Sequence, residues 1–152
     1  QLRRNFQGYT DDPHATLIGL GATSISQFRE GFVQNLKDRR AWGEAVAAGR
    51  LPVERGVAIT GDDRLRGRAI EVLMCQMSVD AGEVCREMGA PQGSLDAALA
   101  KARALVPAGL CQVDGQRVSV PPAARHFLRT VAQCFDGRTP VTGGAARHAK
   151  AV

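Results

Sequence analysis

The sequence lacks the features that would place it in a membrane or a secretory pathway. No apolar run approaches the roughly 18 residues that a membrane-spanning helix needs. No basic stretch followed by an apolar stretch forms a secretory leader. We therefore expect a cytoplasmic protein with no membrane partner.

Metal-binding and catalytic patterns are also missing. The four cysteines, Cys75, Cys85, Cys111 and Cys134, include no pair at the short spacing of a metal site, and the three histidines form no cluster. Buried free thiols are the favoured interpretation. The chain has no nucleophile–base–acid set, and its glycine pair at 19–22 is too short for a dinucleotide-binding fingerprint. We expect no catalytic centre and no metal ligands within this chain.

Positive charge is present without being concentrated. The 152 residues carry a formal net charge of +5, and 17 of the 20 basic residues are arginine. They are spread along the chain among acidic residues, with no block of five or six, which favours a solvated surface over a nucleic-acid interface. The length suits one domain with its own core.

Hydrophobic periodicity predicts a mainly helical chain with a small β component. Residues 16–26 are strand-like, although Gly19 and Gly21 interrupt them, and residues 27–36 are ambiguous. An Asp114-Gly115 turn predicts a hairpin over 110–120, and Ser94 is the expected N-cap of one helix. The expected helices cover residues 37–49, about 60–78, 80–88, 94–106 and 121–136.

The order helix, helix, helix, hairpin, helix is similar to a winged helix, which often binds DNA. The candidate recognition helix, 94–106, carries Lys101 and Arg103 but also Asp96, and it lacks a cluster of Arg, Asn and Gln that would contact base edges. The favoured interpretation is a helical bundle with this winged-helix-like arrangement, in a structural or partner-docking role. We expect an extended segment at 1–36, a helical domain at 37–136 and a tail at 137–152.

The opening stretch fits neither helical nor strand periodicity, and it begins without a methionine, so we expect a piece of a larger protein. Arg-Asn-Phe-Gln-Gly-Tyr-Thr at 4–10, followed by Leu-Ile-Gly-Leu-Gly-Ala-Thr-Ser-Ile-Ser at 17–26, resembles the C-terminal part of oxygen-independent coproporphyrinogen III oxidase, a radical S-adenosylmethionine (SAM) enzyme. The similarity continues through Arg55–Asp63 and Cys134-Phe135-Asp136, over roughly residues 2–136. The Phe-Gln-Gly-Tyr motif favours the oxidase over its haem-chaperone relatives.

The resemblance implies the chemistry of a complete enzyme. An N-terminal barrel would hold a [4Fe-4S] cluster on a C-x3-C-x2-C motif and bind two SAM molecules. A SAM-derived radical would initiate the oxidative decarboxylation of two propionates of coproporphyrinogen III to vinyl groups, giving protoporphyrinogen IX. Because this sequence lacks the cluster motif, we expect it to be the C-terminal domain alone, joined to its own barrel in the enzyme, monomeric, and inactive by itself.

The resemblance also implies that Ile25 lines the second SAM, with Phe6 and Gln7 near the same site. An apolar β-branched side chain can pack against the adenine, an amide can bond the amino-acid end, and Phe6 offers a stacking face. The structural alternative makes Phe6, Tyr9 and Ile25 core residues at a domain junction. Two other functions stay open: a haem-chaperone-like relative without oxidase activity, and a winged-helix nucleic-acid-binding module.

Overall fold

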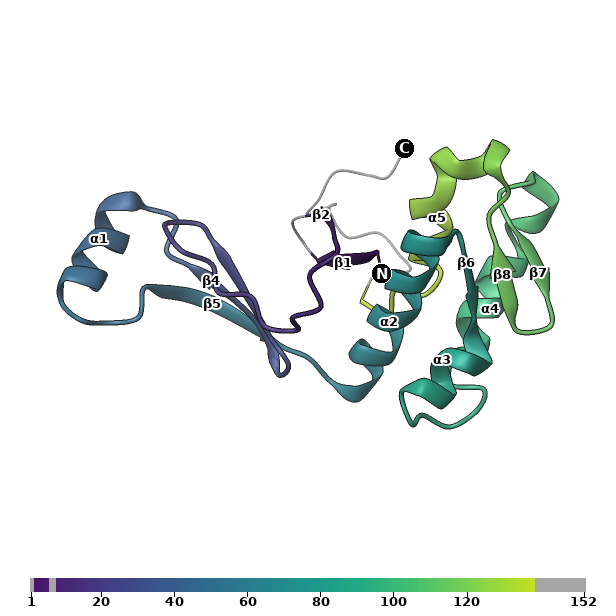
Figure 1. Ribbon diagram of the computed structural model, residues 1–152, viewed down its shortest axis with the longest axis horizontal. Coiled ribbons are helices and arrows are strands. Elements are labelled where there is room, and N and C mark those ends of the chain that lie inside the picture. Colours follow the sequence, from purple (N-terminus) through teal and green to yellow (C-terminus); the bar gives the residue numbers. More distant parts are fainter. Residues whose placement is uncertain (1, 6–7, 139–152) are drawn as a thin grey trace. The chain divides into compact units, whose positions relative to one another are not determined.

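The computed structural model describes residues 2–5 and 8–138 (Figure 1). The chain divides into two compact units, Gln1–Asp11 with Asp62–Val152, and Asp12–Gly61. Phe6, Gln7 and most of the expected tail, 139–152, lie outside the described residues. The boundary that we expected after residue 36 lies within the unit Asp12–Gly61.

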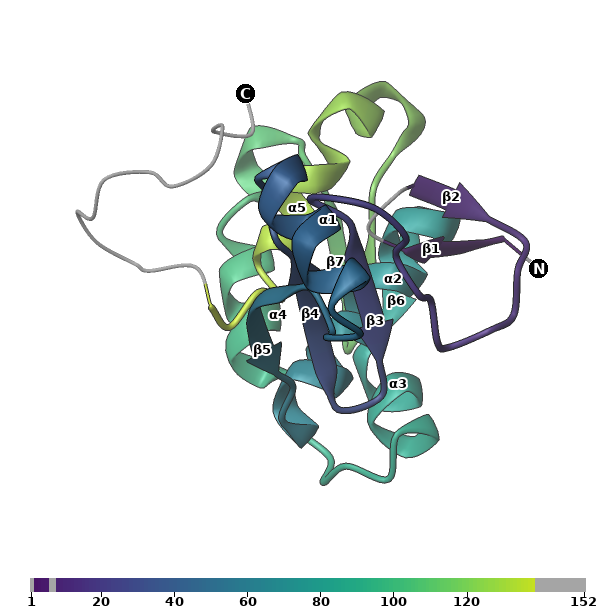
Figure 2. The same ribbon diagram turned by 90° about the vertical axis from the view of Figure 1, so that its left-hand side faces the viewer.

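The unit Asp12–Gly61 is a small antiparallel sheet with one helix. Its strands β3 (Ile25–Phe28), β4 (Gly31–Asn35) and β5 (Val53–Ala58) lie in the order β3-β4-β5, and Figure 2 shows β4 between the other two. Helix α1 (Arg39–Ala47) connects β4 to β5. Its N-cap is Asp38, whose Oδ1 accepts a hydrogen bond of 2.7 Å from the Ala41 amide.

The prediction of a strand over 16–26 is wrong for most of these residues. Only Ile25 and Ser26 belong to β3, while a single bridge joins Leu17 to Gln27 and a turn lies between. The two glycines explain the error, because they allow a tight turn where Ile and Leu alone would favour an extended strand. The ambiguous residues 27–36 form most of the β3–β4 hairpin.

The other unit is built around α2 (Gly61–Gln76), close to the helix predicted over 60–78. Its buried residues Leu65, Ala69, Leu73 and Met74 face the main core, as expected for a central helix. Two short strands, β1 (Arg3–Asn5) and β2 (Gly8–Thr10), pair antiparallel and lie beside α2 (Figures 1 and 2).

The remainder of this unit alternates short helices and short strands, and its sheet has the order β6-β8-β7. In chain order the elements are β6 (Ser78–Asp80), α3 (Ala81–Glu87), α4 (Asp96–Arg103), the 3-10 helix η1 (Val106–Ala108), β7 (Gln112–Asp114), β8 (Arg117–Ser119), the 3-10 helix η2 (Pro122–Phe127) and α5 (Leu128–Gln133).

Three details of this region differ from expectation. Strand β6 was missed because three residues between two helices carry no periodicity. The hairpin is confirmed, but Asp114 pairs with Arg117, so its turn is Gly115-Gln116, one residue later than predicted. Ser94 does not cap α4, because its hydroxyl donates to the Pro91 carbonyl at 2.7 Å and the N-cap position is Leu95.

The fold is therefore a small mixed α/β arrangement, with five α-helices and three small sheets in the described residues. The mainly helical class was predicted correctly for residues 61–138 but underestimates the β content before them. Phe135, Leu73, Leu95 and Leu99 are the largest fully buried side chains of the main core. None of the helices in the described part of the chain is long and apolar enough to cross a membrane.

Candidate functional site

The paired strands β1 and β2 are linked to α2 by hydrogen bonds from Arg4 and Tyr9. The Arg4 amide donates to Glu71 Oε1 at 3.4 Å, and the Tyr9 hydroxyl donates to the Met74 carbonyl at 3.3 Å. Met74 lies in the last turn of α2, where carbonyls lack a partner within the helix. Tyr9 is 55% exposed in this chain.

Ile25 opens β3 directly after a strained turn. Gly21 and Thr23 have φ of 99° and 65°, and a positive φ is uncommon for a β-branched residue such as Thr23. A Cβ on Gly19 would lie 2.7 Å from the Ile25 carbonyl oxygen, so this position has room only for glycine. The turn therefore passes very close to the backbone of Ile25, which is itself half-buried.

Two buried polar side chains fix the path of this turn. Asn35 Nδ2 donates to the carbonyls of Gly19 and Gly21, at 3.2 and 2.9 Å, and Ser26 Oγ accepts from the Gly19 amide at 3.1 Å. Asn35 and Ser26 are 8% and 7% exposed, and they are the buried polar residues of the described chain. Because buried polar groups are costly without partners, these bonds select one conformation of the turn.

The strand register places Ile25 in a row with two polar side chains. Ile25 lies opposite Gln34, and Gln34 lies opposite Arg55. Directly opposed residues point to the same face of a sheet. Gln34 is bonded at both ends of its amide: Nε2 donates to the Thr23 carbonyl at 3.1 Å, and Oε1 accepts from Arg55 Nε at 2.8 Å. The row thus combines an apolar surface, an amide and a guanidinium.

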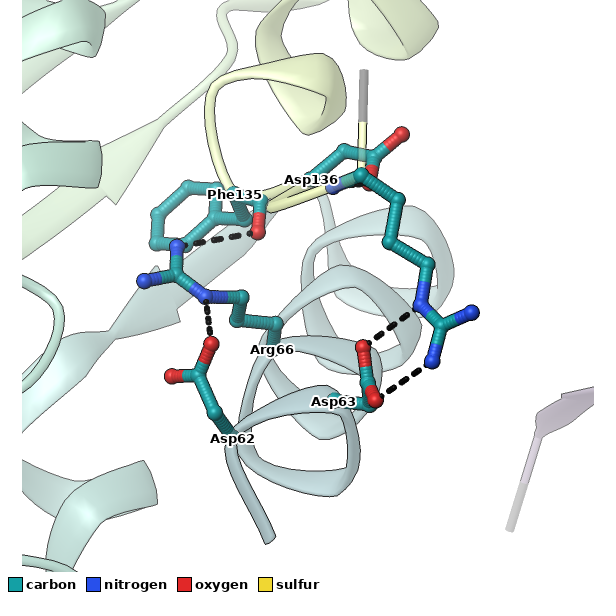
Figure 3. A network of polar contacts seen from close by, with 6 residues as sticks. Asp62, Asp63, Arg66, Phe135 and Asp136 are labelled. Carbon is teal, nitrogen blue, oxygen red and sulfur yellow. Dashed lines mark hydrogen bonds and ion pairs between the residues drawn. The ribbon is translucent and has the colours of Figure 1, made fainter. Parts of the chain in front are cut away.

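A second polar network joins the start of α2 to the segment after α5 (Figure 3). Arg66 Nε donates to Asp62 Oδ2 at 2.7 Å, and its Nη1 donates to the Phe135 carbonyl at 3.4 Å. Beside it, Arg138 forms an ion pair with Asp63 at 2.7 Å. The motifs ending in Asp63 and beginning at Cys134, which are far apart in sequence, therefore meet in space.

The cysteines do not form a metal site in the described residues. All four are free, and no group of three or more His, Cys, Asp and Glu side chains in residues 2–5 and 8–138 could hold a metal ion. Burial raises the pKa of the Cys111 and Cys134 thiols, which disfavours the thiolate form that metals bind. The described residues therefore do not fit an iron–sulfur cluster.

No family model matches the chain, but individual proteins do. It is 37% identical over 151 residues, 99% of its length, to oxygen-independent coproporphyrinogen III oxidase from Bradyrhizobium diazoefficiens, of which it covers 33%. It is 40% identical over 137 residues, 89% of its length, to the protein of the same name from Thermostichus vulcanus, of which it covers 42%.

The structure matches coproporphyrinogen III oxidase (HemN) from Escherichia coli with a TM-score of 0.82 and 29% identity, over 91% of this chain and 32% of that one. The chain is therefore related to part of a radical SAM enzyme. Within that class its relatives are the oxygen-independent coproporphyrinogen III oxidases, so the predicted resemblance is confirmed. The chain spans about a third of the length of the curated relatives that it matches.

Sequence reasoning missed three residues of the row and the turn. Gln34 and Asn35 lie in the segment that had no clear periodicity, and Arg55 was noted only as part of a motif. The available signal was the pair Gln34-Asn35, two adjacent amide side chains that follow the glycine-interrupted stretch. It could not be interpreted without knowing that β4 pairs with both β3 and β5.

Proposed function

We propose that this chain is the C-terminal part of an oxygen-independent coproporphyrinogen III oxidase. The similarity to enzymes of that name over 99% of the chain is the observation that carries the proposal. The complete enzyme would convert two propionates of coproporphyrinogen III to vinyl groups, as a monomer in the cytoplasm. SAM, when bound, would supply the radical that abstracts hydrogen.

The part of this chain is to bind and orient rather than to supply the cluster. Ile25 lies on a sheet face beside Gln34, and the turn before it is held by Asn35. This arrangement supports the expectation that Ile25 packs against the second SAM. That Phe6 and Gln7 lie near the same site is proposed from the resemblance alone. The cluster ligands would come from the N-terminal barrel, so we propose that residues 1–152 alone are inactive.

We also propose that the helix–hairpin region serves packing rather than DNA binding. Arg103, one of two basic residues on the candidate recognition helix, donates from Nη2 to the Gly115 carbonyl at 3.1 Å. Its guanidinium therefore joins α4 to the hairpin turn. This contact favours a winged-helix-like unit in which α4 stabilises the hairpin. The resemblance alone supports our proposal that this unit covers the barrel.

The coding region upstream of Gln1 tests the proposal first. A C-x3-C-x2-C motif is expected there, and its absence would contradict both the oxidase and the haem-chaperone alternative. The complete, cluster-reconstituted protein should then form protoporphyrinogen IX from coproporphyrinogen III with SAM and a reductant. Cluster and SAM binding without this product would favour the chaperone-like relative, and salt-sensitive DNA binding by the 152-residue chain would favour the nucleic-acid module.

The place of Ile25 is tested by SAM stoichiometry in the complete protein. Ile25→Asp should abolish one of the two SAM equivalents in equilibrium dialysis, because a charge replaces an apolar contact. Ile18→Asp is the matched control, since Ile18 lies seven residues earlier and is 68% exposed. Equal SAM binding by both variants and the parent would remove Ile25 from the site.

A further inference from the structure

One face of the sheet β3-β4-β5 places a cation on the same face as the proposed SAM-lining residue, with one strand between them. Ile25, Gln34 and Arg55 form one row across the three strands. Two residues further along each strand, Gln27, Phe32 and Val57 form the next row of the same face. The face therefore offers apolar area from Ile25, Phe32 and Val57, with a single positive charge at Arg55.

The exposed guanidinium of Arg55 is oriented by a hydrogen bond to Gln34. Gln34 accepts from Arg55 Nε at 2.8 Å and donates to the Thr23 carbonyl at 3.1 Å, so the amide cannot rotate without losing a bond. A guanidinium is planar, and a bond at Nε sets the direction of its two terminal nitrogens. Arg55 is thus oriented in advance by a chain of bonds that begins in the turn before Ile25.

Among the described residues, no carboxylate neutralises the charge of Arg55. Arg40, Arg66, Arg68 and Arg138 each form an ion pair with a carboxylate, whereas the hydrogen bond of Arg55 goes to a neutral amide. The adjacent acid, Glu54, instead pairs with Lys37 at 3.9 Å. Within residues 2–5 and 8–138, Arg55 has no carboxylate at ion-pair distance, and its terminal nitrogens are available for two parallel bonds.

We propose that Arg55, oriented by Gln34, binds a carboxylate of the ligand that packs on Ile25. This inference rests on the proposed function, which supplies two carboxylate-bearing ligands. One is SAM, through its methionyl carboxylate, and the other is coproporphyrinogen III, through a propionate. A bidentate arginine–carboxylate contact matches both, and the apolar side chains of Phe32 and Val57 in the adjoining row suit the rest of either molecule.

Two binding measurements on the complete protein show whether the carboxylate belongs to SAM or to coproporphyrinogen III. SAM is measured by equilibrium dialysis, and coproporphyrin III, the fluorescent oxidised form with the same propionates, is measured by fluorescence quenching. Arg55→Gln should weaken one of these ligands about tenfold to a hundredfold, since a charge-assisted hydrogen bond contributes roughly 1.5–3 kcal/mol. Loss of SAM assigns the methionyl carboxylate, and loss of the porphyrin assigns a propionate.

Two further variants test the role of orientation and charge. Gln34→Glu keeps Arg55 but places a carboxylate against its Nε, so it should weaken the same ligand as Arg55→Gln. Arg55→Lys keeps the charge without the planar fork and should recover part of the affinity. Arg50→Gln, the same change at an exposed arginine of the same unit, should leave both affinities within about twofold of the parent.

Unchanged affinities for both ligands in Arg55→Gln, or equal loss of both, would overturn the inference. The failure of the proposed function is distinguishable, because Ile25→Asp reports on it separately. If Ile25→Asp loses one SAM equivalent while Arg55→Gln changes neither ligand, the inference alone is wrong. If the parent protein binds neither ligand, the proposed function is wrong and the inference is overturned with it.

Discussion

Arg138 donates hydrogen bonds to both carboxylate oxygens of Asp63. Its Nε and Nη2 donate to Oδ1 and Oδ2 at 2.8 and 2.7 Å across 75 residues of sequence. The hydrogen bonds and charge of Asp63 raise the pKa of Arg138, so the guanidinium stays charged. Asp63 also lies in the first turn of α2, where a negative charge is favourable, and the pair therefore joins the C-terminal segment to the positive end of that helix.

Arg138→Gln should destabilise the 152-residue chain in a salt-dependent manner. The Arg138 side chain is 52% exposed, so its interaction with Asp63 is screened by added salt. The midpoint of thermal unfolding, followed by circular dichroism, should fall at low salt and approach that of the parent at about 1 M NaCl.

The matched control is Arg129→Gln, at an exposed arginine of α5. It removes the same charge without removing any ion pair seen in residues 2–5 and 8–138, so its unfolding midpoint should stay closer to that of the parent at low salt. An equal effect of the two substitutions would show that net charge, and not the contact with Asp63, explains the change.

Elements were predicted correctly from the sequence where a hydrophobic periodicity extends over several helical turns. Helix α2 was predicted within two residues of its ends, because Leu65, Ala69 and Leu73 repeat along one buried face. The hairpin β7–β8 was located from its glycine turn, although the turn is one residue later than predicted. In both cases the determining interactions are local in sequence.

The candidate site was predicted less completely because its geometry depends on distant pairs. Ile25 came from the resemblance, and its position in a half-buried strand remains consistent with that role. Asn35 and Arg55 became interpretable only through the register of β4 with its two neighbours. A single residue of slip would move each of them to the opposite face, and composition carries no information about register.

Gly19→Ala should destabilise the unit Asp12–Gly61. A Cβ at this position would meet the Ile25 carbonyl oxygen at 2.7 Å and Ser24 Cβ at 2.8 Å, and a backbone contact cannot relax as a flexible side chain does. We expect a loss of about 1–3 kcal/mol in the free energy of unfolding by urea, as for other overpacked positions.

Gly43→Ala, in the same unit, should change the free energy of unfolding in the opposite direction. Gly43 lies inside α1, and nothing within 4 Å would contact its Cβ. Replacing an interior helical glycine with alanine should stabilise the helix by about 0.5–1 kcal/mol. If both substitutions shifted the unfolding midpoint in the same direction, the close approach of Gly19 to β3 would not be the cause.

The buried thiols should make the chain less stable at alkaline pH. Burial raises the pKa of Cys111 and Cys134, so the folded state holds these protons when the unfolded state begins to release them. Stability from this source is full below the ordinary thiol value of about 8.5 and falls as the pH rises above it. Urea unfolding between pH 7 and 10.5 should show this decline. The double variant Cys111→Ala, Cys134→Ala should have a smaller slope against pH, and an unchanged slope would assign the decline to other groups.

Asn35→Asp should destabilise the chain more at neutral pH than in acid. The substitution directs a buried carboxylate at the Gly19 and Gly21 carbonyls, which now accept hydrogen bonds from Asn35 Nδ2. Losing both bonds and burying a charge should cost roughly 2–4 kcal/mol at neutral pH. Because burial without donors raises the pKa of a carboxyl group, the penalty relative to the parent should shrink as the pH falls towards about 4, where the protonated group can donate again.

The control for this substitution is Asn35→Ala, which removes the donors without adding a charge. Its loss of stability should not depend on pH, so the difference between the two variants should change between about pH 4 and neutral pH. Urea unfolding of parent and variants at matched pH values measures this difference directly. Parallel pH curves for the two variants would mean that the introduced carboxylate points to solvent, and that Asn35 does not hold the turn before Ile25 through its side-chain amide.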